Sequence, residues 1–130
     1  MEHKKHYRPW GYYEILATGP GYKVKRLVVD PGKRTSLQWH EKRDEDWMVI
    51  GGDNWEFVRQ FPMPWGKDNR TRSDSNFTKV SIAKKERHRT SNTGTEPLVI
   101  IEVQTFDEND PSGEEDIHRI EDDYGREVEL

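Results

Sequence analysis

Residues 32–52 read GKRTSLQWHEKRDEDWMVIGG, with glycine at both ends and many polar side chains between them. Gln38 and His40 stand two positions apart, so on a β-strand both side chains point to the same face. Glu45 follows His40 by five positions, which leaves room for a turn that returns the carboxylate beside the pair. The stretch therefore predicts two adjacent strands that present polar side chains to a common space.

A fourth polar side chain, His88, lies on a separately predicted strand that spans residues 87–92. Two imidazoles, one carboxylate and one amide oxygen suit a divalent ion such as Zn, Mn, Fe, Co or Ni. A lone histidine is more often structural than ligating, and it is the spacing of the set that favours ligation. We therefore predict one divalent metal ion held by Gln38, His40, Glu45 and His88.

Short runs rich in β-branched and aromatic residues, separated by turn residues, extend on both sides of this stretch. Asp30-Pro31-Gly32 is the clearest turn, because proline fixes one φ angle and glycine readily adopts the positive one. The pattern predicts an all-β barrel or sandwich with little helix. The predicted strands span residues 11–17, 22–29, 35–40, 46–50, 55–60, 77–82, 87–92 and 98–105.

The remaining segments are predicted to be irregular. Residues 61–75 form a long loop, residues 107–116 an acidic linker, and residues 117–122 a short C-terminal helix or turn. Residues 1–7 and 107–116 are expected to be mobile. The length of 130 residues suits a single domain that spans the whole chain.

The composition limits the choice of core and of partner. Hydrophobic residues make up 31% and charged residues 35%, so we expect a thin core, which favours a homodimer. The net charge of −4 argues against a nucleic-acid partner. Cysteine is absent, no apolar run is long enough to span a membrane, and the N-terminus lacks the hydrophobic stretch of a signal peptide. A cytoplasmic location is the expectation.

The same residues carry a family resemblance. The run Gly32-x5-Gln38-x-His40-x4-Glu45-x6-Gly52 resembles the first cupin motif, with glutamine in place of the first histidine. His88 followed by Asn92 is similar to the end of the second cupin motif. More narrowly, Arg8-Pro9-Trp10-Gly11 and the end Glu121-Asp122-Asp123-Tyr124-Gly125-Arg126 resemble the cupin domain of type II mannose-6-phosphate isomerases. The resemblance implies a cupin barrel, that is, a jelly-roll-like double-stranded β-helix.

The resemblance also implies a reaction, the interconversion of mannose 6-phosphate and fructose 6-phosphate through an enediolate. Such a reaction needs a base, an electrophile and an anchor for the phosphate. Arg34 is the first candidate for the anchor, and Lys25, Lys23 and Arg119 follow. Arg34, Lys25 and Arg119 are the candidate catalytic residues, while the base for the carbon acid stays unassigned.

Two departures from the family pattern leave other functions open. Glu41, Lys42 and Asp46 stand where the family has histidines, and Ala83-Lys84-Lys85 stands where it has a Pro-x-Gly turn. Three hypotheses therefore remain: a metal-dependent sugar-phosphate isomerase, a non-catalytic cupin that binds a sugar or small anion, and a metal-dependent cupin of another reaction type.

Overall fold

The computed structural model describes residues 3–60, 68–73, 77–110 and 116–128, and these residues form eleven strands and no helix. Consequently, none of the described segments is a helix long and apolar enough to cross a membrane. The strands are β1 (Lys5–Arg8), β2 (Gly11–Gly19), β3 (Tyr22–Val29), β4 (Leu37–Trp39), β5 (Arg43–Gly51), β6 (Trp55–Gln60), β7 (Asp68–Ser73), β8 (Thr78–Ile82), β9 (Arg87–Asn92), β10 (Leu98–Phe106) and β11 (His118–Glu121).

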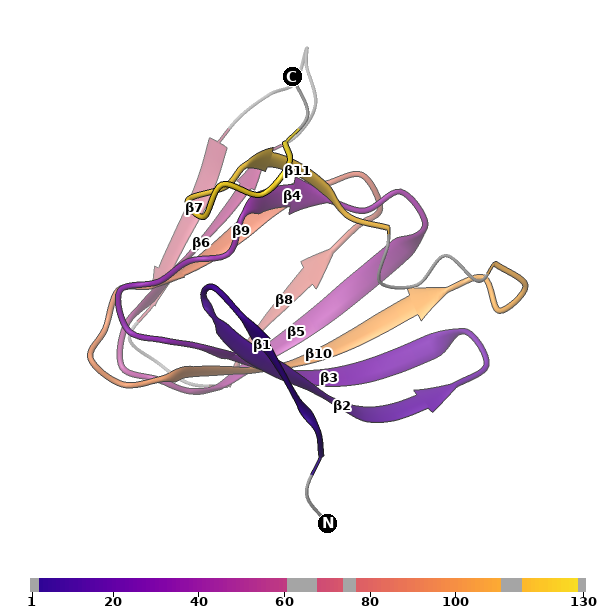
Figure 1. Ribbon diagram of the computed structural model, residues 1–130, viewed down its shortest axis with the longest axis horizontal. Helices are drawn as coiled ribbons and strands as arrows, with labels where there is room; N and C mark the ends of the chain where they lie inside the picture. The colour runs from indigo at the N-terminus through magenta and orange to yellow at the C-terminus, as the bar shows by residue number, and fades with distance from the viewer. Residues whose placement is uncertain (1–2, 61–67, 74–76, 111–115, 129–130) are drawn as a thin grey trace.

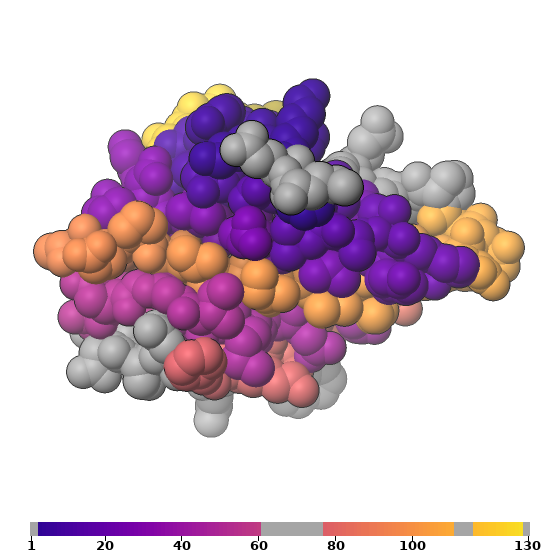
Figure 2. Space-filling view, turned by 90° about the horizontal axis from the view of Figure 1, so that it is seen from below, coloured from indigo at the N-terminus to yellow at the C-terminus, as the bar shows by residue number. Residues whose placement is uncertain are grey.

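The strands form two antiparallel sheets that face each other (Figure 1). The larger sheet has the order β1-β2-β3-β10-β5-β8, and the smaller has the order β11-β4-β9-β6-β7. Figure 2 shows the outer face of the larger sheet, where β10 runs as an orange band between β3 and β5. Two facing antiparallel sheets of this kind form a jelly-roll-type barrel, as the sequence predicted.

Alternation along the central strands decides which side chains enter the barrel. On β5 the residues Arg43, Glu45, Trp47 and Val49 are buried, while those between them point outward or are half-buried. On β10 the inward residues are Leu98, Ile100, Glu102 and Gln104. Apolar residues therefore line one end of the barrel, and polar residues continue the same inward faces toward the other end.

The apolar end holds the core. The buried cluster includes Val29, Val49, Trp55, Leu98 and Ile100, and three of these are essentially inaccessible to solvent. The turn that leads from β3 toward β4 begins beside this cluster, at Asp30-Pro31-Gly32. Gly32 has a φ of 78°, and the Lys33 amide donates to the Asp30 carbonyl at 3.0 Å. These features define a type II turn, in which the third residue needs a positive φ. The predicted roles of Pro31 and Gly32 are confirmed.

Three predicted irregular segments contain strands. Residues 117–122 form no helix or turn, because β11 pairs with the edge of β4. Within the predicted loop 61–75, β7 pairs with β6; residues 61–67 and 74–75 lie outside the described residues. At the N-terminus β1 pairs with β2. Each of these strands gains its backbone partners from an existing sheet edge, which a local composition argument does not detect.

Candidate metal centre

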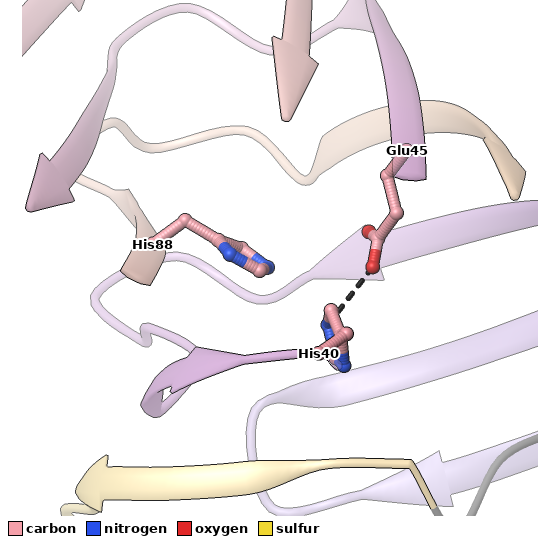
Figure 3. A group of neighbouring side chains, drawn as sticks. All are labelled: His40, Glu45 and His88. Atoms are coloured by element: carbon pink, nitrogen blue, oxygen red, sulfur yellow. Dashed lines mark ion pairs between the residues drawn. The ribbon is translucent and has the colours of Figure 1, made fainter. Parts of the chain in front are cut away.

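Three ligand-type side chains from three strand regions meet inside the barrel (Figure 3). His40 directly follows β4, His88 lies on the neighbouring β9, and Glu45 projects from β5 in the opposite sheet. One ligand atom from each lies within 4.8 Å of the others. All three residues are at most 3% exposed, so the group is shielded from bulk water.

Both histidines are oriented by backbone carbonyl groups. His40 Nδ1 lies 2.7 Å from the Asp116 carbonyl oxygen, and His88 Nδ1 lies 3.0 Å from the Glu86 carbonyl oxygen. A carbonyl oxygen only accepts hydrogen bonds, so each Nδ1 carries the proton and donates it. In the His88 ring this leaves the Nε2 lone pair free for another partner, whereas His40 Nε2 already lies 2.8 Å from Glu45 Oε2. Metal-binding histidines are commonly held in the same way by a carbonyl group on the second ring nitrogen.

The site is arranged to keep Glu45 ionised. Burial opposes its ionisation, but the charge of His40, the hydrogen bond from His40 and the Arg43 guanidinium together hold the pKa of Glu45 well below its usual range. Glu45 Oε2 lies 2.8 Å from His40 Nε2 and 3.0 Å from Arg43 Nε. Glu45 Oε1 accepts a hydrogen bond from Trp47 Nε1 at 2.9 Å. The carboxylate is therefore fixed in position as well as charged.

His88 is neutral at physiological pH. Burial lowers its pKa to about 4, so the ring keeps a lone pair on Nε2 above that pH. Among the described residues, His88 Nε2 is one of the buried polar atoms without a hydrogen-bond partner. A buried nitrogen of this kind is costly unless it finds a partner. Two imidazole nitrogens, one of them orphaned, and an ionised carboxylate fit a divalent metal ion.

The fourth predicted ligand, Gln38, lies nearby. It is opposite His88 in the β4–β9 pairing, and its side chain lines the same cavity as His40 and Glu45. Its Oε1 accepts a hydrogen bond from Ser36 Oγ at 3.4 Å. The structure thus brings the predicted quartet to one region, with His40, Glu45 and His88 as the close group.

A cavity of about 150 Å³ opens beside this group. Its charged lining residues come from strands of both sheets and from the C-terminal segment. The positively charged ones are Arg8, Lys25, Arg43, Arg119 and Arg126, and the acidic ones are Glu45 and Glu102. The wall therefore carries an excess of positive charge, which suits an anionic ligand.

Only some of the predicted anion-binding residues line the cavity. Lys25 and Arg119 line the cavity, and Lys25 Nζ lies 4.2 Å from the centroid of the Tyr13 ring. Lys23 is two residues before Lys25 on β3 and does not line the cavity. Of the predicted set, Lys25 and Arg119 are thus in position to meet a ligand bound there.

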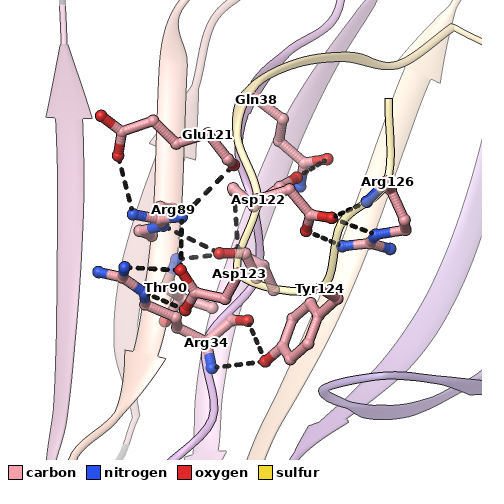
Figure 4. Close-up of polar contacts among 11 residues, drawn as sticks. Arg34, Gln38, Arg89, Thr90, Glu121, Asp122, Asp123, Tyr124 and Arg126 are labelled. Atoms are coloured by element: carbon pink, nitrogen blue, oxygen red, sulfur yellow. Dashed lines mark hydrogen bonds and ion pairs between the residues drawn. The ribbon is translucent and has the colours of Figure 1, made fainter. Parts of the chain in front are cut away.

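Arg34 is not at the cavity, so the structure does not support its predicted role as phosphate anchor. Its guanidinium forms two hydrogen bonds to the Asp123 carboxylate, at 2.5 and 2.8 Å (Figure 4). Its backbone is also held by the Tyr124 hydroxyl, which donates to the Arg34 carbonyl at 2.8 Å. The C-terminal segment therefore folds over the entry to β4 and engages Arg34 on the outside of the barrel.

Sequence reasoning missed Arg43 and Glu102. Arg43 lies on β5, and its Nη2 is 3.1 Å from His40 Nε2. Glu102 lies on the inward face of β10, where burial raises its pKa to about 8. Glu102 Oε1 accepts a hydrogen bond from Gln104 Nε2 at 2.5 Å. A sequence signal for Glu102 does exist: it stands two positions after Ile100, so on a strand that continues the apolar run 98–101 its side chain points inward with that of Ile100.

The facing sheets and the central His/Glu/His group define a cupin domain. Residues 1–122 match the family described as mannose-6-phosphate isomerase, C-terminal. The chain belongs to this family.

The comparisons with individual proteins agree with this assignment. The chain is 40% identical over 131 residues to alginate biosynthesis protein AlgA of Pseudomonas aeruginosa, covering 99% of this chain and 24% of that protein. It is 34% identical over 130 residues to a mannose-1-phosphate guanylyltransferase of Klebsiella pneumoniae, covering 96% of this chain and 25% of that protein. The chain thus spans about a quarter of the length of these relatives.

Solved structures show the same fold. Capsular polysaccharide assembling protein CapF of Staphylococcus aureus superposes with a TM-score of 0.74 at 19% identity, covering 93% of this chain and 35% of that chain. Oxalate decarboxylase of Bacillus subtilis superposes with a TM-score of 0.70 at 19% identity, covering 81% and 28%. At these identities the likeness concerns the fold alone.

Proposed function

We propose that this cupin domain is a metal-dependent isomerase that interconverts mannose 6-phosphate and fructose 6-phosphate. The observation that carries the proposal is the His40–Glu45–His88 group beside a positively charged cavity in a member of the mannose-6-phosphate isomerase family. His40, Glu45 and His88 would hold the ion, with Gln38 as a further oxygen donor at the cavity wall. A divalent ion bound there would polarise the sugar oxygens and stabilise the negative charge that develops in the enediolate.

The reaction also requires a residue of the protein to donate a proton to one sugar oxygen and to accept a proton from another. Glu45 is engaged by His40, Arg43 and Trp47. Glu102, by contrast, keeps its proton at neutral pH because of burial, and it lines the cavity. We assign Glu102 the role of giving a proton to O1 of the open-chain aldose and recovering one from O2. General acid catalysis of this kind typically contributes about 100-fold to 10,000-fold.

A second function, ligand binding without catalysis, is favoured by the position of Arg43. Its guanidinium contacts both His40 Nε2 and Glu45 Oε2, at 3.1 and 3.0 Å. The Arg43 guanidinium therefore already supplies a positive charge beside His40 and Glu45, where a metal ion would otherwise supply it. In a non-catalytic cupin, this arrangement would stabilise the barrel, and the cavity would bind a sugar or small anion.

A metal analysis followed by a coupled assay separates the two functions. Purified protein is loaded with Zn, Mn or Co, and fructose 6-phosphate formed from mannose 6-phosphate is measured. The isomerase proposal predicts turnover that falls at least about 100-fold in a His88→Ala variant. The matched control is His118→Gln, because His118 stacks on Trp39 and is not part of the His/Glu/His group. Stoichiometric metal without turnover would overturn the isomerase proposal and support the binding function.

A further inference from the structure

A residue outside the His/Glu/His group holds the bend that joins two members of that group. His40 directly follows β4 and Glu45 lies on β5, so the bend at residues 41 and 42 lies between them. The Asp116 carboxylate accepts a hydrogen bond from each backbone amide of this bend, from Glu41 at 3.0 Å and from Lys42 at 2.9 Å. Each carboxylate oxygen takes one amide, so the two contacts together fix the path of the bend.

The same residue orients the imidazole of His40. The Asp116 carbonyl oxygen lies 2.7 Å from His40 Nδ1 and accepts the hydrogen bond from that ring nitrogen. The pairing of β11 with β4, which starts with His118 opposite Trp39, brings the backbone at residue 116 close to His40. The two carboxylate contacts then fix where the carbonyl group lies. One residue therefore sets both the orientation of the His40 ring and the path of the chain from His40 to Glu45.

The Asp116 carboxylate is buried, and the residue is only 7% exposed. Burial of a carboxylate is costly unless its oxygens accept hydrogen bonds, and the two amides of the bend supply them. His118 Nε2 lies 3.8 Å from Asp116 Oδ1, which is beyond hydrogen-bond distance. The hydrogen bonds of the buried carboxylate are thus directed to the bend beside the candidate metal centre.

The bend depends on its backbone and not on the identity of its side chains. Glu41 and Lys42 are exposed, and it is their backbone amides that contact Asp116. These are two of the positions at which the sequence departs from the histidines of the family pattern. Any residue other than proline supplies a backbone amide, so these departures leave the contacts of Asp116 in place.

We propose that Asp116 is a positioning residue for the candidate metal centre. Its carboxylate fixes the bend between His40 and Glu45, and its carbonyl group orients the His40 ring so that Nε2 faces Glu45. Groups that hold a metal ligand without contacting the ion typically contribute about 10-fold to 100-fold to metal affinity. The inference rests on the metal binding of the proposed function and is independent of the sugar phosphate.

Titration of the metal-free whole chain with Co(II), followed by visible absorption, tests this role, because the spectrum of bound Co(II) reports the geometry of its ligands. We expect Asp116→Ala to weaken Co(II) binding about 10-fold to 100-fold and to change the spectrum. Asp116→Asn should weaken binding less, because it keeps one acceptor oxygen for the bend. The matched control is Asp53→Ala, and urea unfolding verifies that each variant is folded. The Asp53 carboxylate also accepts from two backbone amides, those of Thr95 at 2.9 Å and Glu96 at 3.1 Å, but it does not line the cavity.

Two outcomes would overturn the role of Asp116: no Co(II) binding by the unaltered protein, or an affinity and spectrum in the Asp116 variants that equal those of Asp53→Ala. If Asp116→Ala does not fold, Asp116→Asn decides between the outcomes. The inference and the isomerase proposal fail separately. Co(II) binding that weakens in the Asp116 variants, without turnover of mannose 6-phosphate by the unaltered protein, refutes only the isomerase. Turnover by the unaltered protein, together with unchanged Co(II) affinity in the Asp116 variants, refutes only the positioning role.

Discussion

Glu102 shows how a single residue couples the cavity to pH. It is 4% exposed, its partner in the β3–β10 pairing is Lys25, and its partner in the β5–β10 pairing is Trp47. Burial is the main reason that its pKa rises to about 8, and the negative charge of Glu45 adds to the effect, while Lys25 and Arg43 oppose it. At neutral pH the folded protein therefore holds a proton that the unfolded chain releases.

This difference predicts a stability change that depends on pH. Between the ordinary glutamate pKa of 4.5 and the folded value of about 8, the folded state binds the extra proton, so stability falls as pH rises through this window. The slope from this group is at most about 1.4 kcal/mol per pH unit. We expect Glu102→Gln to remove this contribution to the pH dependence. The free energy of unfolding of the variant should therefore increase relative to that of the unaltered protein as the pH rises from 5 to 8. Urea unfolding of metal-free protein at several pH values measures this.

The control for Glu102→Gln is Glu41→Gln, which changes an exposed carboxyl and should leave the pH profile as it is. Parallel profiles for the unaltered protein and Glu102→Gln would show that Glu102 is ionised in the folded state. Its assigned role as an acid toward the sugar oxygens would then fail as well.

Individual residues of the site differ in how far sequence could locate them. Gln38, His40 and Glu45 were predictable because strand alternation and a short turn fix their relative positions. The position of the Arg34 side chain was not predictable, because it depends on a hydrogen bond to Asp123, which is distant in sequence. Arg8 and Arg126 reach the cavity from the two ends of the chain, and no local pattern indicates that those ends meet.

At the scale of elements, the C-terminal segment is held by one side chain. The Tyr124 hydroxyl donates to the Arg34 carbonyl at 2.8 Å and accepts from the Arg34 amide at 3.3 Å. These bonds fasten the chain after β11 to the entry of β4. Because Arg126 follows two residues later, the same anchor positions one wall of the cavity.

Removal of this hydroxyl should loosen the segment. We expect Tyr124→Phe to lower the free energy of unfolding by about 1–2 kcal/mol, since two backbone groups of Arg34 lose their partner. Urea unfolding with tryptophan fluorescence measures the change. Tyr7→Phe is the control, because Tyr7 is 71% exposed and its hydroxyl should contribute little. Equal stability of the two variants would mean that water replaces the Tyr124 hydroxyl without cost.

The strands of the barrel were predictable where alternation and turns are strong. Residues 55–60 and 87–92 form β6 and β9 with the predicted bounds. The strand predicted for residues 35–40 is shorter, since β4 covers only Leu37–Trp39. β1, β7 and β11 lie at or next to sheet edges and are short or polar, so tertiary pairing rather than local propensity makes them strands.

At the scale of the whole molecule, the candidate metal centre joins the two sheets. His40 and His88 belong to the region of β4 and β9, while Glu45 belongs to β5 in the opposite sheet. The hydrophobic core extends up to this group, since the rings of Trp47 and Phe57 lie against the His88 ring. An ion bound by all three side chains would therefore connect the two sheets directly beside the hydrophobic core.

Metal binding should consequently stabilise the entire barrel. A ligand that binds only the folded state adds about 2.7 kcal/mol at a free concentration 100 times its Kd, which corresponds to a rise in Tm of about 10 °C for a domain of this size. Calorimetry with and without Zn or Mn measures the shift. We expect the metal-dependent rise in Tm in the His118→Gln protein and no such rise in the His88→Ala protein. Because His88→Ala also removes packing, the difference in Tm with and without metal is compared for each protein, and not the absolute Tm. An equal shift in all three proteins would place the bound ion outside the His40–Glu45–His88 group.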